Sequence, residues 1–341
     1  MLSYGSIVLA AQLWAPEVVL GSSGQLKLPL LWDVNTTWQF VVTFPLLVAF
    51  LHSERAFIPA QLAKLVHAGS LHCVQDGEPM CEDWQTSYRL WNIVAQIVGV
   101  PCGFLAAYGN YVQVTRVGWT SWQAPYGHVN AAGWVWMVWF AVFYCAVTVY
   151  IARALVTVFF LRAVARDCRI TPVPFHTDHA GGLEPVGRIG LRNQYILAAA
   201  GINIVLLILV ANQFESRPGD LMYFLVALAC GVYVVFGPIG FLGPLLPFRQ
   251  VMSAQKQRLL AEASKAVRAQ HERIRAEIAT QRLTAEDDAV LDRLLKYMRT
   301  AQRMPVWPFD LVTRRKFAAA YVVPMLTMVG SSVLNWLLSR K

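Results

Sequence analysis

The sequence predicts an all-α, polytopic membrane protein with about six transmembrane helices and one helical hairpin outside the membrane. Six apolar stretches are each long enough to cross a bilayer, and one basic segment, residues 247–316, separates the last two. Hydrophobic residues make up 56% of the chain and charged residues 14%, whereas soluble proteins have about 45–50% and ~25%. A water-soluble fold of this length could not bury so much continuous apolar helix.

The spans follow from the length of each apolar stretch. A helix needs ~20 mostly apolar residues to cross the ~30 Å hydrocarbon core. This criterion divides the chain into an N-terminal segment (1–36), five spans (37–246), the hairpin (247–316) and a last span (317–341). The predicted spans are Thr37–Ser53, Tyr88–Tyr108, Gly133–Leu161, Asn193–Asn212, Leu221–Leu246 and Phe317–Leu338.

The first twenty residues resemble a signal sequence only superficially. They have no basic n-region, Pro16 and Glu17 interrupt the apolar run, and there is no small-x-small cleavage site. We therefore expect residues 1–20 to form an interfacial or re-entrant helix that stays attached to the protein.

The distribution of Lys and Arg predicts the orientation. About half of the 29 basic residues lie between Arg249 and Lys316, and a second basic loop joins the third and fourth spans. Basic loops stay in the cytoplasm, so with six spans both termini face outward. This topology places Cys73 and Cys81 in a reducing compartment, which disfavours a disulfide between them. The net charge of +9 then indicates contact with anionic lipid rather than with nucleic acid.

The basic segment is predicted to form a cytoplasmic helical hairpin. Its first helix continues out of the fifth span, and its second begins at the N-cap Thr284 and ends at Met304 and Pro305. A narrow apolar stripe on the first helix requires a partner helix, within the hairpin or in a second subunit, and predicts a homo-oligomer with coiled-coil character. The stripe consists of Leu260, Val267, Ile274 and Ile278.

Residues 174–185, between the third and fourth spans, concentrate polar side chains. His176, Asp178 and His179 fall within four residues, and Gly181 and Gly182 allow a sharp turn. The first interpretation is a loop lock, in which Asp178 accepts backbone N–H groups at the turn. The second is a metal site, for which the two histidines and the carboxylate would recruit a ligand from elsewhere. Apart from such a metal, no cofactor is expected.

The same loop carries a resemblance to a known group. The order of motifs is similar to that of uncharacterised bacterial multi-pass membrane proteins with an H-P-D-x-A-G-G-L loop and a Pro-bearing last span. The resemblance covers Gly133 to Leu338, and this chain departs from the group at Thr177 and at Glu184-Pro185. It implies a bacterial inner membrane and carries no biochemical role. The matching residues are Gly133, Trp134, Trp136, Arg153, Arg162, Arg166, His176–Leu183, Arg303–Asp310, Tyr321 and Pro324.

Two features inside the spans could carry chemistry. Arg153 lies in the middle or inner half of the third span, where a cation is costly; it must find a partner, or it extends to the inner interface. The fifth span ends in a run of glycines and prolines that we predict to break the helix, as an ion site in a pore or as a packing kink. The run contains Gly237, Pro238, Gly240, Gly243, Pro244 and Pro247.

Three functions remain open from the sequence. An oligomeric channel or pore for an unspecified ion or small solute comes first, followed by a membrane scaffold whose hairpin docks a soluble protein. The third and least favoured function is a metal-assisted enzyme at the inner face, using His176, Asp178 and His179. The sequence therefore favours a protein that is not an enzyme. Without Asp or Glu in any predicted span, a proton- or sodium-coupled transporter is disfavoured.

Overall fold

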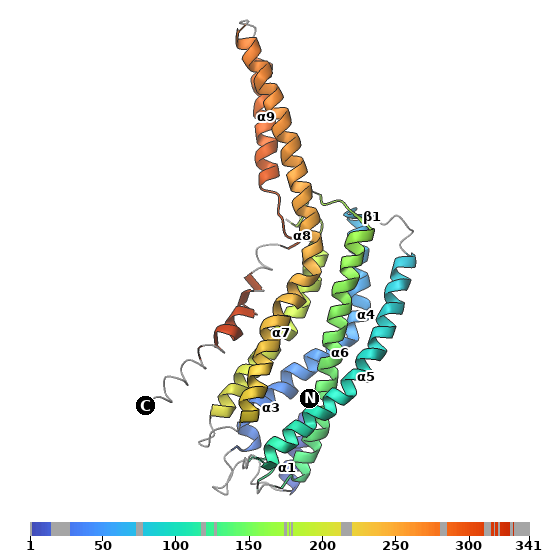
Figure 1. The fold of residues 1–341 in the computed structure, drawn as a ribbon, viewed down its shortest axis with the longest axis vertical. Coiled ribbons are helices and arrows are strands. Elements are labelled where there is room, and N and C mark those ends of the chain that lie inside the picture. Colours follow the sequence, from blue (N-terminus) through green and yellow to red (C-terminus); the bar gives the residue numbers. More distant parts are fainter. Residues whose placement is uncertain are drawn as a thin grey trace.

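The computed structural model describes residues 2–14, 28–72, 78–116, 121–125, 128–173, 176, 178, 180–212, 220–279, 285–309, 315–316, 318–319, 321–327 and 330. Five helical segments in this part of the chain are long and apolar enough to cross a membrane. The protein is therefore all-helical in class and a multi-pass membrane protein in type (Figure 1). The segments are Val34–His67, Arg89–Thr115, Ala131–Asp167, Glu184–Val210 and Ala227–Ala276.

Each of these five segments overlaps one of the first five predicted spans, and most of the predicted sixth span, Phe317–Leu338, lies outside the described residues. The helices are α1 (Leu2–Trp14), η1 (Leu30–Trp32), α3 (Val34–Trp38), η2 (Gln39–Thr43), α4 (Phe44–His67), α5 (Glu78–Arg116), α6 (Ala131–Asp167), α7 (Glu184–Asn212), α8 (Asp220–Ala279) and α9 (Ala285–Gln302). Two short strands, β1 (Leu71–His72) and β2 (Arg169–Ile170), pair antiparallel.

The first span is longer than predicted. The sequence places its end at Ser53, whereas α4 continues to His67 with Pro59 inside the helix. Residues 54–67 contain no glycine and only this one proline, so the backbone has no reason to leave the helix after Ser53. Residues 54–67, which the predicted span leaves out, are therefore helical, and Glu54 lies in a helical segment that is long and apolar enough to cross a membrane.

Glycines set how closely α5 and α6 approach each other. A Cβ added to Gly103 would lie 2.3 Å from the carbonyl oxygen of Ala141, and one added to Gly99 would lie 3.2 Å from that of Cys145. Small residues at such contacts allow the backbones of membrane helices to pack closely. The pair α5 and α6 is thus held together tightly along its middle.

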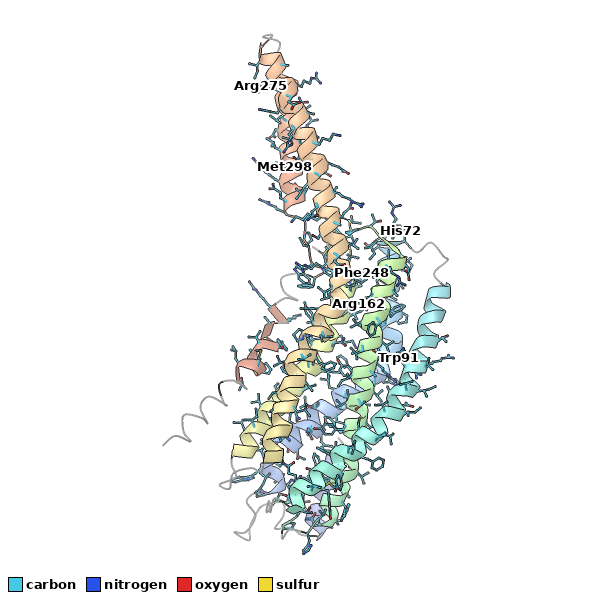
Figure 2. All side chains as sticks on the ribbon, viewed as in Figure 1. His72, Trp91, Arg162, Phe248, Arg275 and Met298 are labelled. Carbon is cyan, nitrogen blue, oxygen red and sulfur yellow. The ribbon has the colours of Figure 1, made fainter. Side chains whose placement is uncertain are left out.

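The main apolar core lies where the hairpin leaves the bundle (Figures 1 and 2). Buried side chains of α6, α7 and α8 meet there with the end of α4 and with β1. Phe248 and Met252 of α8 are fully buried in this core. Its other fully buried members include Leu65, Leu71, Leu161, Leu183, Val186 and Leu245.

The prediction that the glycine and proline run breaks the fifth span is wrong. Helix α8 is continuous from Asp220 to Ala279, with Pro238, Pro244 and Pro247 inside it. A proline leaves the carbonyl four residues earlier without its helical N–H partner. For Pro238 this is the carbonyl of Val234, which accepts from the hydroxyl of Tyr321 at 2.9 Å. For Pro244 it is that of Gly240, which accepts from Nδ2 of Asn193 at 3.3 Å.

Helices α8 and α9 form an antiparallel hairpin that extends away from the bundle (Figure 1). Of the predicted stripe, Ile274 is buried, Leu260 and Val267 are half-buried, and Ile278 is exposed. The base of the hairpin is closed by Lys256, whose Nζ donates to the carbonyls of Gln302 at 2.7 Å and Met304 at 2.9 Å. The stripe thus faces the partner helix for most of its length.

Candidate functional site: an intramembrane polar cluster

Two sets of predicted site residues are described by the structure: residues 176, 178 and 180–185 of the loop at 174–185, and polar side chains of the spans. In the loop, the carboxylate of Asp178 accepts the backbone N–H groups of Ala180 at 2.9 Å, Gly182 at 3.0 Å and Glu184 at 3.3 Å. Nδ1 of His176 lies 2.9 Å from Oδ1 of the same carboxylate. Asp178 thereby satisfies backbone donors at the start of α7.

The two glycines of the loop adopt the left-handed conformation. Gly181 has φ +69° and Gly182 has φ +80°, which L side chains rarely adopt. A Cβ on Gly182 would also lie 2.1 Å from Oγ of Ser70, next to β1, and one on Gly181 would lie 3.4 Å from Cε of Met252 in α8. The loop therefore packs between the end of α4 and the base of the hairpin.

Opposing influences act on the pKa of Asp178. Burial raises it, while the N–H groups of Gly182 and Ala180, the His176 side chain and the N–H of Glu184 lower it, and the net result is a pKa below the usual range. The carboxylate is consequently charged at neutral pH, at the N-terminus of α7, where a negative charge is favourable.

The metal interpretation of this loop stays a prediction. His176 and Asp178 are in contact, whereas His179 lies outside the described residues. Within the described part of the chain, no three His, Cys, Asp or Glu side chains gather as metal ligands. Cys73 also lies outside the described residues, as does the side chain of Cys81.

Arg153 of α6 is buried among three helices, with only 8% of its surface exposed. Its Nε donates to Oδ1 of Asn92 in α5 at 2.9 Å, and Nη2 donates to the same oxygen. Nη1 donates to the backbone carbonyl of Leu51 in α4 at 2.9 Å and lies 3.8 Å from Oε2 of Glu54. The guanidinium of Arg153 is therefore held by partners on α4 and α5.

Glu54 is one of several site residues that the sequence did not predict. Its other oxygen, Oε1, accepts from the hydroxyl of Thr157 in α6 at 3.4 Å. The error began with the helix end, because a span that stops at Ser53 places Glu54 in a loop. The helix-compatible residues after Ser53 could have corrected it, since they extend a stretch of 17 residues, short for a membrane-spanning helix, by a further four turns.

A second arginine, Arg192 of α7, completes the cluster. Its Nη2 donates to the carbonyl of Phe50 at 2.7 Å and to Oγ of Ser53 at 2.8 Å. The guanidinium carbon also lies 4.7 Å and 4.5 Å from the ring centres of Phe50 and Phe57, in the range of cation–π contacts. The hydroxyl of Tyr150 lies nearby and donates to Oδ1 of Asn193 at 3.3 Å.

These side chains border a small cavity of about 10 Å³. It is lined by residues of α4, α6 and α7, including Glu54, Tyr150, Thr157, Arg192 and Asn193. A cavity of this size holds about one water molecule. The polar cluster is therefore packed closely around a space for a single small polar species.

The glycines proposed from the sequence as pore residues pack against neighbouring helices. A Cβ on Gly237 would lie 2.2 Å from the ring of Tyr321, and one on Gly243 would lie 3.1 Å from Val158 of α6. A Cβ on Gly240 would lie 3.5 Å from Leu197 of α7. The carbonyl of Gly237 accepts from Nε2 of Gln194 at 3.5 Å. The structure thus brings the cluster around Arg153 together and places this run against α6, α7 and Tyr321.

Comparison of the chain with protein-family models, with curated proteins and with solved structures finds no match in any of the three. The resemblance to proteins with an H-P-D-x-A-G-G-L loop accordingly stays a prediction. The fold and the site define a class: a multi-pass helical membrane protein in which four spans contribute a partly buried polar cluster with two arginines and one glutamate.

Proposed function

We propose that the protein is an oligomeric integral membrane channel or pore, and that the polar cluster is the narrowest point of its pathway. The observation that supports this proposal is the meeting of Arg153, Arg192 and Glu54 between membrane-spanning helices. Ionisable groups are costly inside a membrane and usually mark the path of an ion or a substrate.

The charges of the cluster favour an anion as the species that passes. Two guanidinium groups accompany one carboxylate, and neutral hydrogen-bonding groups from Ser53 and Asn92 surround them. Arginine and lysine side chains line pores that select anions. The cluster thus supports transport of a small anion.

In the proposed channel this conformation is closed, because the cavity is too small for an ion to pass. A space of about 10 Å³ accommodates roughly one water molecule and no hydrated ion. Conduction therefore requires α4 and α7 to separate at the contacts between Arg192 and Phe50 or Ser53.

Ion flux into liposomes tests the proposal. We expect chloride to pass in preference to potassium, because the cluster has an excess of positive charge. The variants Arg153→Gln and Arg192→Gln should lower the ratio of chloride to potassium flux. Arg162→Gln is the matched control, since Arg162 lies exposed at the end of the same helix as Arg153 and should leave the ratio unchanged. No flux of either ion from an intact oligomer, or selection of potassium by the wild type, would overturn the proposal.

The proposed location is a bacterial inner membrane with the hairpin in the cytoplasm. The basic residues of 247–316 support this orientation. Ala269 is exposed on the hairpin, and Leu31 is exposed near the N-terminus of the first span, at the opposite end of the bundle. In a background without native cysteines, an impermeant thiol reagent applied to whole cells should label Leu31→Cys and spare Ala269→Cys. The reverse pattern would invert the orientation.

A membrane scaffold is the second candidate function, and the hairpin supports it. The hairpin projects from the bundle and exposes Ile278, Val290 and Tyr297. If this surface docks a soluble protein, crosslinking in cells should capture one defined partner at the hairpin. Replacement of the three side chains with Ser should abolish that capture while leaving the thermal midpoint unchanged. Such a result together with no flux would place the scaffold ahead of the channel.

A metal-assisted enzyme at the inner face remains a remote third proposal. It rests on the contact between His176 and Asp178. Elemental analysis of the purified protein tests it, because a site built on these residues should carry stoichiometric metal that disappears in His176→Ala. Absence of metal from the wild type, purified without chelator, would leave the loop with a structural role.

A further inference from the structure

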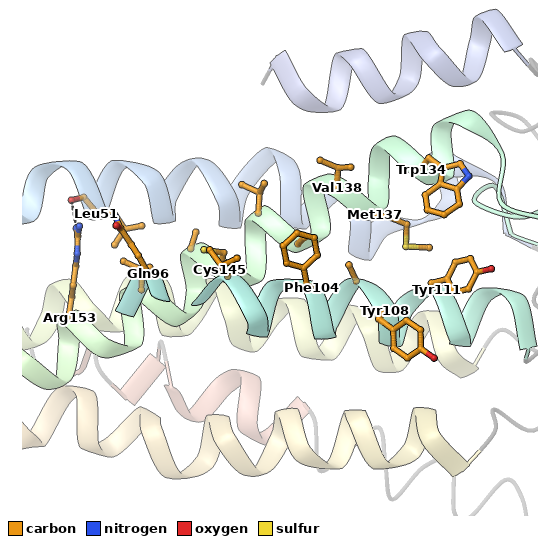
Figure 3. Close-up of a pocket in the computed structure, with 16 residues that line it drawn as sticks. Leu51, Gln96, Phe104, Tyr108, Tyr111, Trp134, Met137, Val138, Cys145 and Arg153 are labelled. Carbon is orange, nitrogen blue, oxygen red and sulfur yellow. Dashed lines mark hydrogen bonds between the residues drawn. The ribbon is translucent and has the colours of Figure 1, made fainter. Parts of the chain in front are cut away.

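A groove of about 910 Å³ runs along α5 and α6 (Figure 3). This volume lies within the range of small-molecule binding sites. The groove is preformed, because Gly99 and Gly103 hold α5 against α6 along the same stretch. Its walls are almost wholly apolar and include Val100, Phe104, Val138, Val142, Cys145 and Ala146.

The two ends of the groove differ. Tyr111 and Trp134 stack at one end, with ring centres 5.9 Å apart, and Gln96 and Arg153 lie at the other (Figure 3). From Trp134 to Arg153 the groove follows α6 for roughly 28 Å at 1.5 Å per residue, close to the ~30 Å thickness of the hydrocarbon core. Trp and Tyr mark a membrane interface. Arg153 then lies near the opposite edge of the hydrocarbon layer.

The groove is open toward the surroundings of the bundle. Phe104, Val138 and Val142, three of its lining residues, have exposed side chains. In a membrane, a hollow with such walls is in contact with lipid chains, because water does not enter this layer. A lipid chain would bury the apolar side chains without leaving a void.

The charge at one end favours an anionic head group. Arg153 provides the guanidinium, which suits phosphate oxygens, and Gln96 provides an amide beside it. The carboxylate of Glu54 lies 3.8 Å from Nη1 of Arg153, and Arg192 in the same cluster restores the positive balance. A zwitterionic head group gains less from such an environment than an anionic one.

We propose that this groove holds an acyl chain of an anionic phospholipid, whose phosphate lies beside Arg153 and Gln96. The lipid comes from the leaflet at the Arg153 end, and its chain follows α6 toward Trp134. This binding site shares Arg153 with the proposed pathway, but lipid labelling requires only the groove and this charge and not ion conduction, so the two proposals can fail separately.

Photo-crosslinking tests the site. The full-length protein is reconstituted with phosphatidylglycerol that carries a diazirine in one acyl chain, irradiated and digested. We expect saturable labelling at one lipid per chain, on peptides that contain Gln96, Cys145 or Ala146. Unlabelled phosphatidylglycerol should compete severalfold better than phosphatidylcholine with the same chains. Competition by a free fatty acid as strong as that by phosphatidylglycerol would contradict the phospholipid assignment.

Matched variants separate the groove from ordinary surrounding lipid. Val142→Trp fills the groove from an exposed position and should abolish the saturable labelling, whereas Val98→Trp, exposed on α5 but outside the groove, should retain it. Arg153→Gln should remove the preference for phosphatidylglycerol. If that variant does not fold, Gln96→Leu provides the same test, because it keeps the buried arginine, and it should reduce the preference. Labelling spread evenly over α5 and unchanged by Val142→Trp would overturn the proposal. So would dissociation of a dimer by Val142→Trp, since a second copy would then cover the groove.

Discussion

The loop around Asp178 and the cluster around Arg153 satisfy polar groups in opposite ways. Asp178 accepts N–H groups two, four and six residues further along the chain. Arg153 reaches partners 61 and 102 residues away, on two other helices. The loop therefore depends on local backbone conformation, while the cluster depends on the packing of the whole bundle. A substitution in the loop should therefore change the structure only locally, whereas a substitution in the cluster should loosen several spans together.

The largest effect is expected from Arg153→Met. Removal of one partner from a buried ion pair leaves an uncompensated charge, which costs on the order of 3 kcal/mol. We expect the thermal midpoint in detergent to fall strongly and the protection of α4, α5 and α6 from hydrogen exchange to fall together. Arg162→Met, at an exposed position of α6, should change neither. Loss of protection confined to α6 would show that the cluster does not connect the spans.

Gly182→Ala should have the next largest effect, and its melting is compared with that of Gly181→Ala. An L side chain at positive φ costs roughly 1 kcal/mol, and at Gly182 it would also collide with Oγ of Ser70. Gly181→Ala carries the conformational cost with an ordinary contact to Met252. Melting should therefore show Gly182→Ala to be less stable than Gly181→Ala, and Ser70→Gly should restore part of the difference. Equal melting of the two alanine variants would argue against the packed loop.

Asp178→Ala should have the smallest of these effects, about 1 kcal/mol, and its effect should depend on pH. The folded pKa of Asp178 lies below its usual value of about 3.9. The stabilisation is therefore fully present above pH ~4 and is lost as the pH falls through the folded pKa. Melting of the wild type and the variant should differ at pH 7 and converge at low pH. A difference that does not change with pH would exclude the charged carboxylate as its cause.

The sequence predicts what depends on composition and on neighbouring residues. The first five spans follow from apolar length, and the turn at Gly181 and Gly182 follows from the need for positive φ. In the hairpin, the stripe through Ile274 follows from helical spacing. Each of these features depends on residues that lie close together in the sequence.

The partners of buried polar groups could not be predicted in this way. The carbonyl freed by Pro238 is matched by Tyr321, 87 residues away, so a helix that seems broken in the sequence remains continuous in the structure. Glu54 and Asn92 join Arg153 only after α4, α5 and α6 have packed. Because the predicted span stopped at Ser53, about four turns before the helix ends at His67, the prediction left the carboxylate of Glu54 in a loop.

Arg153 and Glu54 interact inside the bundle, and a double-mutant cycle measures that interaction most directly. Arg153→Met, Glu54→Gln and the double variant are melted in the same detergent and compared with the wild type. We predict that the double variant is more stable than the sum of the two single effects allows, by about 1 kcal/mol or more, because it leaves neither charge buried alone. Additive effects of the two substitutions would contradict the interaction and, with it, the cluster as a functional unit.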